Sequence, residues 1–298
     1  MKVDYKCINC ILNYASELLP KVIANNHFSS TQIFNDYKTM IQKILNQLNP
    51  DLEFSYLSKI FFDTFFEIFP NKDYFYIEKT NANQHFLEIY DDLIDLCLST
   101  EDPLKSAFKL CVMGELFSHT SENSFGELEI EINSFFRNKT IVINDFQQLN
   151  KDLEKANSLL FIHNYAGEIV FDKLFIKTIK DIYPNLIIHS AVKSKPVYKC
   201  ATMKDAEEIF LKEISIPFES GSDYLGTLWE DSTSTFKNIF ENADIIIVKG
   251  QANYESLANL SSRKPIYFSL VVNCKVISEL LGVNVGDLIF KKNSTNVK

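Results

Sequence analysis

Apolar residues in the first part of the chain recur every three or four positions. This spacing covers residues 10–23, 31–48, 54–68 and 85–98, and each stretch has the length and pattern of an amphipathic helix. A further segment, 104–117, follows Glu101-Asp102-Pro103, and acidic residues before a proline are typical of a helix start. The pattern therefore predicts that the first part of the chain is helical.

From about residue 140 the pattern changes to short apolar runs. Such runs occupy residues 157–162, 186–191, 245–248 and 265–272, with helical spacing between them. Strands that alternate with helices form a largely parallel sheet wrapped by helices. Glycine follows the same division, since none occurs before Gly114 and seven of the eight lie at Gly126 or later. We predict an all-helical domain over 1–140 and a Rossmann-like α/β domain, carrying the ligand site, over 141–298.

Composition and net charge argue against several classes of protein. A chain of 298 residues with 46% apolar residues buries a substantial core, and its net charge of −9 argues against a nucleic-acid or anionic-membrane partner. We find no apolar run of membrane-spanning length and no signal-peptide core, so we expect a cytoplasmic protein. In a reducing compartment the six cysteines are thiols or metal ligands rather than disulfides.

Polar residues gather in three stretches that follow predicted strands. Residues 163–168 read His-Asn-Tyr-Ala-Gly-Glu, 196–202 read Pro-Val-Tyr-Lys-Cys-Ala-Thr, and 249–255 read Lys-Gly-Gln-Ala-Asn-Tyr-Glu. Open α/β sheets bind ligands at the carboxyl ends of their strands. In the first stretch Gly167 would let the backbone approach a ligand closely, and the helix after it would direct N–H groups at an anion.

Together the three stretches resemble the motifs of the damage-control phosphatases, an acidic-residue-methyltransferase-like family also called domain of unknown function 89. That family shows Asp-Asn-Ala-Gly-Glu, Pro-x-x-Asn-Asp-Ala-Thr and Lys-Gly-Gln-Gly-Asn-Tyr-Glu in this order. The resemblance covers nearly the whole chain and is closest to the branch with an N-terminal Cys-x-x-Cys pair, here Cys7 and Cys10. A glycine followed by Glu115 stands where the family has Gly-Asn. The resemblance implies a metal-dependent phosphatase that uses Mg²⁺ or Mn²⁺.

The residues that would hold this metal have changed. Family members use the Asp and Asn of the first motif and the Asp of the second, because hard cations prefer oxygen ligands, clamp phosphoryl oxygens and activate water. Those positions are occupied here by Asn164, Tyr165 and Cys200. Lys199 replaces the second-motif Asn and brings a positive charge close to the old metal position. These replacements therefore put standard Mg²⁺- or Mn²⁺-dependent phosphatase activity in question.

Several interpretations of the changed site stay open. In the first interpretation, Lys199 takes the place of the metal, and the site binds a phosphorylated ligand without hydrolysing it. In the second, a softer metal is held by His163, Asn164 and Cys200. In the third, Cys200 has a lowered pKa at a helix start beside Lys199 and acts as a nucleophile. A catalytically silent regulatory or scaffold subunit is an alternative of another class.

Other residues are ligand-binding candidates by the resemblance. Lys249 and Asn253 of the third motif would belong to the substrate-phosphate site, and Gly167 and Glu168 of the first motif complete the set. The segment 219–227, Glu-Ser-Gly-Ser-Asp-Tyr-Leu-Gly-Thr, resembles a family loop. Its glycines and hydroxyls would either cradle a phosphate or form a turn.

Three cysteines form a separate candidate site. Cys7 and Cys10 have a metal-ligand spacing, and Cys274 stands where this branch commonly has Lys-Cys. Three thiolates would supply most of a structural soft-metal site that ties the first helix to the last part of the sheet. Reduced cysteines in the core are the alternative. We expect a divergent damage-control-phosphatase-like protein that binds a small phosphorylated metabolite; substrate and oligomeric state are left open by the sequence.

Overall fold

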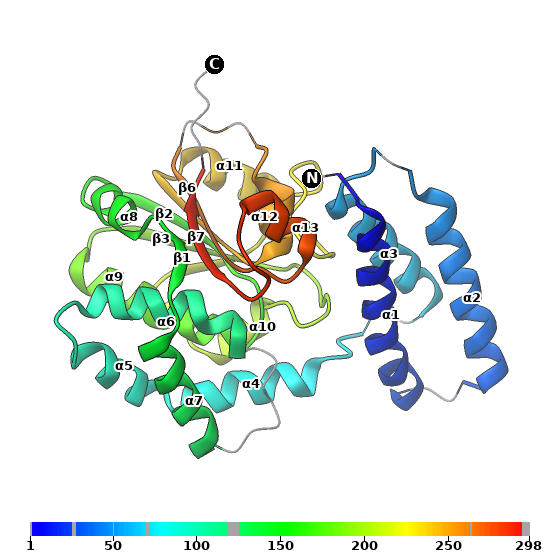
Figure 1. The fold of residues 1–298 in the computed structure, drawn as a ribbon, viewed down its shortest axis with the longest axis horizontal. Coiled ribbons are helices and arrows are strands. Elements are labelled where there is room, and N and C mark those ends of the chain that lie inside the picture. Colours follow the sequence, from blue (N-terminus) through cyan, green and yellow to red (C-terminus); the bar gives the residue numbers. More distant parts are fainter. Residues whose placement is uncertain are drawn as a thin grey trace.

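The computed structural model describes residues 2–25, 28–49, 51–69, 72–117, 125–260, 262 and 264–293. Within these residues, a seven-stranded sheet is covered by helices on both faces, and a bundle of three helices lies beside it (Figure 1). All neighbouring strands are parallel except one pair. The predicted fold class, a helical N-terminal part followed by a Rossmann-like α/β part, is confirmed.

The bundle consists of α1 (Tyr5–Asn25), α2 (Ser30–Gln47) and α3 (Phe54–Ile68). Its apolar core contains a row of phenylalanines from α3 that are shielded from solvent, among them Phe61 and Phe65. The Ser29 hydroxyl accepts a hydrogen bond from the Gln32 backbone N–H and caps the start of α2. Three of the predicted helices are therefore confirmed.

The next four helices pack on the sheet and not in the bundle. They are α4 (Tyr76–Glu88), α5 (Tyr90–Leu98), α6 (Pro103–Phe117) and α7 (Phe125–Asn138), and their buried side chains belong to the same apolar cluster as one face of the sheet. The segment predicted as one helix over 85–98 is interrupted at Ile89, whereas Pro103 does begin α6. The change of element type near residue 140 is as predicted, but the apolar clusters divide between α3 and α4. The division into domains at residue 140 stays a prediction.

The strands lie in the order β1-β7-β6-β5-β2-β3-β4, and only β6 and β7 are antiparallel. Their bounds are β1 (Ile141–Asn144), β2 (Ser158–Ile162), β3 (Ile187–Val192), β4 (Ile216–Glu219), β5 (Ile245–Lys249), β6 (Ile266–Val271) and β7 (Leu288–Lys292). The predicted runs correspond to β2, β3, β5 and β6. The strands that were not predicted, β1, β4 and β7, are half-exposed over part or all of their length and lack a continuous apolar run.

Alternate residues of the central strands face two helical layers. Leu159 and Phe161 of β2 point to the layer with α6, α8 (Phe146–Leu153) and α9 (Glu168–Ile182), while Leu160 and Ile162 point to the other layer. That second layer contains α11 (Ser234–Asn242), α12 (Gln251–Leu257) and α13 (Lys275–Leu281). A short helix, α10 (Met203–Glu208), follows β3.

The strand order places a topological switch point between β2 and β5. The chain leaves β2 towards β3 and β4 on one side, and it returns through α11 to β5 on the other side. In open α/β sheets the crevice at such a point, outside the carboxyl ends of the strands, is where ligands bind. The first and third motif stretches both start at this crevice.

Candidate functional site

The three motif stretches meet at the carboxyl edge of the sheet. The Ala201 N–H donates to the Asn164 carbonyl at 2.9 Å, and the Ala166 N–H donates to the Lys199 carbonyl at 3.0 Å. The Asn253 amide donates to the His163 carbonyl at 3.4 Å. Segments that are far apart in sequence therefore share one edge, as the strand pattern predicted.

Asn164 lies directly on the turn between β5 and α12. Gly250 in this turn has φ +86°, and a Cβ added there would stand 2.5 Å from the Asn164 Oδ1. The Asn164 Nδ2 donates to the Glu168 Oε2 at 3.0 Å. Because the position lacks a side chain, the Asn164 amide packs on the backbone of residue 250 with its orientation fixed by Glu168.

Behind this turn lies a buried group of charged residues that we call the Lys249 network: Lys249, Glu168, Asp172 and His163. The Lys249 Nζ lies 2.9 Å from the Asp172 Oδ1 and 2.9 Å from the Glu168 Oε1, the latter an ion pair without hydrogen-bond alignment. It also donates to the Cys111 carbonyl. The His163 Nδ1 is 2.8 Å from the other Asp172 oxygen. All four side chains are at most 1% exposed.

The charges of the network compensate one another. Burial alone would lower the pKa of Lys249, but Asp172, Cys111 and Glu168 outweigh it and the pKa is raised well above its usual value. Burial opposes ionisation of Asp172 as well, yet Lys249 and the hydrogen bond with His163 hold its pKa below the usual value. Burial raises the pKa of Glu168, an effect that Lys249 only partly offsets. A buried ion pair of this kind depends on keeping both partners.

The residues expected to bind the ligand directly contact other residues of the protein. Lys249 is occupied by carboxylates, and Glu168 binds Lys249 and Asn164. Asn253 donates to the Lys249 carbonyl and accepts from Thr227, while Gly167 contacts α4 in place of a ligand. All four residues therefore have contacts within the protein, and the direct ligand contacts expected from the resemblance stay a prediction.

Cys200 is surrounded by protein. Burial raises the pKa of its thiol to about 11, although the nearby Lys193 pulls it down. The Lys193 ammonium donates to the Ser222 hydroxyl at 3.0 Å and to the Gly226 carbonyl. These hydrogen bonds fix the conformation of the segment 219–227. Of the two roles left open for that segment, the turn fits. The Lys199 Nζ lies 5.4 Å from the centre of the Tyr198 ring.

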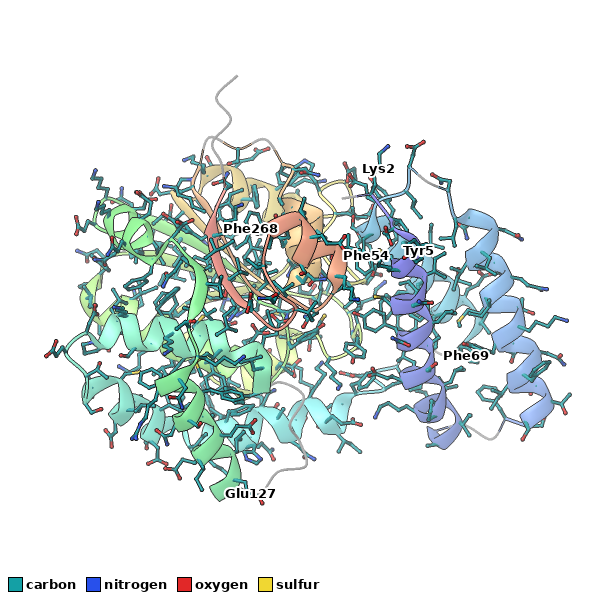
Figure 2. All side chains as sticks on the ribbon, in the orientation of Figure 1. Lys2, Tyr5, Phe54, Phe69, Glu127 and Phe268 are labelled. Atoms are coloured by element: carbon teal, nitrogen blue, oxygen red, sulfur yellow. The ribbon has the colours of Figure 1, made fainter. Side chains whose placement is uncertain are left out.

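A cavity of about 260 Å³ opens beside these residues, and we call it the edge pocket. It lies between α1 and the carboxyl ends of β2, β5 and β6, where the bundle meets the sheet; Phe54, labelled in Figure 2 at this junction, lines it. Its lining residues come from segments far apart in the sequence: Cys7, Cys10, Asn13, Tyr14, Glu17, Phe54, Glu115, Tyr165, Tyr198, Gln251, Ala252, Glu255, Asn273 and Cys274.

A chain of hydrogen bonds organises one wall of the edge pocket. The Glu115 carboxyl accepts from a backbone N–H of β6 at 3.0 Å and from the Asn273 amide at 2.9 Å. The Gln251 Oε1 accepts from the Asn273 N–H at 2.8 Å, and its Nε2 donates to Glu255 at 2.9 Å. The same Nε2 lies 3.4 Å from the Cys274 sulfur. These hydrogen bonds fix the positions of the polar groups in the wall without a ligand.

The two carboxyls in this wall differ from those of the Lys249 network. Burial raises the pKa of Glu115 to about 8, and the negative charge of Glu168 adds to the effect. Burial likewise raises the pKa of Glu255 to about 7. The described lining residues include no lysine, arginine or histidine. The wall is therefore acidic, and its carboxyls are partly protonated near neutral pH.

A hard divalent metal does not fit the inherited position. The Asn164 amide donates a hydrogen bond to Glu168, Cys200 is a buried neutral thiol, and Tyr165 places a phenol ring in the edge pocket. Among the described residues, no three histidine, cysteine, aspartate or glutamate side chains are arranged to hold an ion. The softer site of His163, Asn164 and Cys200 has no support, since His163 pairs with Asp172.

The cysteine site is brought together only in part. Cys7, Cys10 and Cys274 all line the edge pocket, so the first helix and the end of the sheet do meet at these thiols. They are not arranged as ligands of one ion within the described part of the chain. Burial raises the pKa of Cys7 to about 11 and also raises that of Cys10. The structural metal site remains a prediction without a preformed geometry.

The edge pocket is lined by neighbours of the residues that the sequence indicated, whose roles stay predictions. Tyr165 and Tyr198 line the pocket, whereas Asn164 and Lys199 beside them do not. The signal for Gln251 and Glu255 was present, because both are third-motif residues shared with the family. Glu115, at the changed Gly-Asn position, carried the same kind of signal.

Comparison with known proteins identifies the family. The damage-control phosphatase ARMT1-like domain matches residues 3–289. The chain belongs to this family. A damage-control phosphatase of Pyrococcus horikoshii is 25% identical over 293 residues, which cover 98% of this chain and 99% of the relative. One from Archaeoglobus fulgidus is 29% identical over 230 residues, 76% of this chain and 78% of the relative.

Two further comparisons extend this similarity. An uncharacterized protein of Methanocaldococcus jannaschii is 32% identical over 229 residues, which cover 74% of each chain. The crystal structure of a DUF89 family protein from Pyrococcus horikoshii superposes with a TM-score of 0.89 and covers 99% of this chain and 100% of the other. At 23% identity this superposition shows that the fold is shared.

Proposed function

We propose that this protein is a divergent member of the damage-control phosphatase family that binds a small phosphorylated metabolite in the edge pocket without hard-metal hydrolysis. The observation that carries the proposal is the state of the inherited metal position. Asn164 is fixed by Glu168, Tyr165 faces the pocket and Cys200 is a buried thiol with a pKa of about 11. None of them offers the anionic oxygen that Mg²⁺ requires.

The edge pocket supports ligand binding in its own right. It lies at the switch point of the sheet, and Gln251 and Glu255 of the most family-like motif face it. Its wall is fixed by the hydrogen bonds of Gln251 and Asn273, so a ligand meets prearranged donors and acceptors. Prearranged polar groups in a cavity are the usual basis of small-molecule specificity.

Lys199 supplies positive charge next to the pocket. Its Nζ lies over the ring of Tyr198, and Tyr198 and Glu17 both line the cavity. Burial lowers the pKa of Lys199, and the attraction of Glu17 and Glu78 opposes this effect. We assign the phosphoryl group of the ligand to this side of the pocket, where a lysine meets it as a point charge.

The geometry is unfavourable for covalent catalysis by Cys200. A nucleophilic cysteine needs a thiolate and access to the substrate. Cys200 is 2% exposed and does not line the edge pocket, and its raised pKa keeps the thiol protonated at neutral pH. Binding without a covalent step is therefore the simpler account of this site.

Turnover with added metal tests the proposal. The purified chain should hydrolyse simple phosphate esters no faster with Mg²⁺ or Mn²⁺ than with a chelator. The combined variant Asn164→Asp, Tyr165→Asn, Lys199→Asn and Cys200→Asp restores the family's ligands and should regain metal affinity, measured by calorimetry. Metal-stimulated turnover by the unmodified chain would overturn the proposal.

No helix among the described residues has the length and apolar character needed to cross a lipid bilayer. The cytoplasmic location expected from the sequence is part of this proposal.

A further inference from the structure

Tyr198, in the lining of the edge pocket, has a backbone conformation that tyrosine rarely adopts. Its φ is +49°, and Phe210 is the only other non-glycine residue with a positive φ in the described part of the chain. A bulky side chain in this region is unfavourable, and the conformation persists only where surrounding contacts hold it. Such backbone strain is concentrated at ligand sites. The contacts of Tyr198 therefore indicate why the chain keeps it.

Tyr198 begins a tight turn in the second motif stretch. The Cys200 N–H donates to the Val197 carbonyl at 2.9 Å, so Tyr198 and Lys199 are the two central residues of the turn. Glycine or asparagine is usual at a central position with a positive φ. Because a turn of two central residues has few conformations, the backbone of Tyr198 determines the direction in which the Lys199 side chain leaves it.

Aromatic rings and a carboxylate from several elements hold the Tyr198 side chain. Its ring lies edge to face with the rings of Phe75 at 4.8 Å, Tyr14 at 5.1 Å and Tyr165 at 6.1 Å between centres. The Tyr198 hydroxyl donates to the Glu17 carboxylate at 2.7 Å. Edge-to-face pairs are favourable beyond the area that they bury. These contacts offset the strain of the backbone and connect the turn to α1 and to the first motif.

The same rings surround Lys199. Its Nζ lies 5.4 Å from the centre of the Tyr198 ring and 5.6 Å from the centre of the Phe75 ring. Ring faces attract an ammonium group through their negative quadrupole, and they do so without a negative charge of their own. The Lys199 carbonyl accepts from the Ala166 N–H at 3.0 Å, which fixes the backbone of the turn as well. Lys199 is therefore held at both its backbone and its ammonium.

Other charged groups act on the Lys199 ammonium. Glu17 and Glu78 attract it, and Lys21 repels it. Each of the two carboxylates has a further partner, since Glu17 accepts from the Tyr198 hydroxyl and Glu78 forms an ion pair with Lys21. A carboxylate that is shared between two partners neutralises each of them less. The positive charge of Lys199 is therefore retained on this side of the pocket.

We propose that Tyr198 is a positioning residue for the phosphoryl contact, because its strained backbone and anchored ring keep Lys199 on the phosphoryl side of the edge pocket. The inference rests on the proposed function, in which Lys199 meets the phosphoryl group. It adds that α1 of the bundle, which holds Tyr198, takes part in forming the site. Tyr198 falls on an open position of the family motif Pro-x-x-Asn-Asp-Ala-Thr, so the resemblance does not single it out.

Inorganic phosphate is the probe for this contact. Its affinity for the full chain is measured by a phosphorus-31 NMR titration with a chelator present. Tyr198→Gly tolerates the positive φ but removes the ring that holds the turn, and the affinity should fall about 10-fold, the factor expected for a lost hydrogen bond to a charged group. Phe210→Gly is the matched control at the other positive φ. Phe210 is 55% exposed and outside the pocket lining, so this variant should bind phosphate like the unmodified chain.

A conservative variant shows whether the ring is responsible. Tyr198→Phe keeps the three ring contacts and removes only the hydrogen bond to Glu17, so it should retain most of the affinity for phosphate. A loss as large as that of Tyr198→Gly would overturn the role of the ring. Tyr198→Leu keeps apolar volume in the bundle core without an aromatic ring. It should lose affinity as Tyr198→Gly does, and it provides the measurement if the glycine variant does not fold.

A double-mutant cycle distinguishes positioning from a general loosening of the site. If Tyr198 acts through Lys199, then Tyr198→Gly should have no further effect on phosphate affinity in a Lys199→Met background. An equal effect of Tyr198→Gly in both backgrounds would overturn the inference, because a loosened site would lose affinity without Lys199 as well.

The two proposals fail in different ways. Phosphate affinity that falls in Lys199→Met but not in Tyr198→Gly would overturn the positioning role alone and leave the proposed function standing. Phosphate affinity that is unchanged in Lys199→Met, or absent from the unmodified chain, would remove the phosphoryl contact of the proposed function and the positioning role with it.

Discussion

The Lys249 network and the edge pocket both contain buried carboxyls at the same edge of the sheet, but the surroundings of these carboxyls differ. In the network the protein supplies the positive charge, since Lys249 lies 2.9 Å from Asp172 and Glu168. In the pocket the wall has carboxyls without a lining lysine, arginine or histidine among the described residues. The network is closed around its lysine, whereas the pocket leaves a cavity of about 260 Å³ beside its carboxyls.

The pKa values of Asp172 in the network and Glu115 in the pocket shift in opposite directions. The pKa of Asp172 is lowered against the effect of burial, because Lys249 and His163 stabilise the carboxylate. The pKa of Glu115 is raised to about 8 by burial. A strongly perturbed carboxyl next to a cavity is a better sign of a ligand site than a compensated one inside a network. This comparison can be tested from both sides.

The largest effect is expected from Lys249→Met. It leaves Asp172 and Glu168 buried without their cation, and breaking a buried ion pair by removing one partner costs about 3–5 kcal/mol of the free energy of unfolding. Denaturant unfolding measures this change. Lys151→Met, at an exposed position of α8, should change stability by less than about 0.5 kcal/mol. A similar small change for Lys249→Met would show that the network contributes little to the fold.

A smaller effect is expected from Gly250→Ala. The added Cβ meets the Asn164 amide, and φ +86° is itself costly for a side chain, by about 1–3 kcal/mol. Gly286→Ala is the matched control, because Gly286 has φ +88° and an added Cβ meets nothing within 4 Å. The difference in unfolding free energy between the two variants isolates the contact with Asn164. Adding Asn164→Ala to Gly250→Ala should recover that difference, and no recovery would refute the contact.

A pH dependence is expected at Glu115. Its pKa is raised from 4.5 to about 8, so the folded protein binds a proton that the unfolded chain releases between these values. The contribution of Glu115 to stability is therefore greatest below pH 4.5 and falls as pH rises to about 8. Glu115→Gln cannot ionise, and its stability relative to the unmodified chain should increase by at least about 1 kcal/mol across this window. A constant difference across the window would place Glu115 in a solvated environment.

The sequence predicted the architecture well because the central strands are continuous apolar runs. β2 and β5 are buried on both faces, and such strands cannot be mistaken for half-exposed ones. β1 and β4 lie at the two edges of the sheet and are only half-buried, so their pattern is weak. Helix α4 was placed incorrectly because its apolar residues show little periodicity, and a break at Ile89 leaves no proline or glycine signal.

The site was harder to predict because a shift of one residue reverses the direction of a side chain. The turn after β2 turns Asn164 inwards and Tyr165 towards the pocket, and no spacing rule distinguishes them beforehand. Lys249 has the chemistry of a phosphate ligand, and only the folded chain shows that Asp172, on α9 after β2, faces it. The acidic wall joins α1, α6 and α12, and sequence spacing does not bring these together.

The central claim is that the edge pocket is the ligand site. Ala252→Phe fills the cavity from α12 without touching the Lys249 network, and Ala24→Phe on the exposed surface of α1 is its control. A thermal-shift screen of phosphorylated metabolites, with a chelator present, supplies the ligand, and calorimetry then compares the affinities. We predict that Ala252→Phe abolishes binding while Ala24→Phe binds like the unmodified chain. Unchanged affinity in a stably folded Ala252→Phe variant would contradict the account.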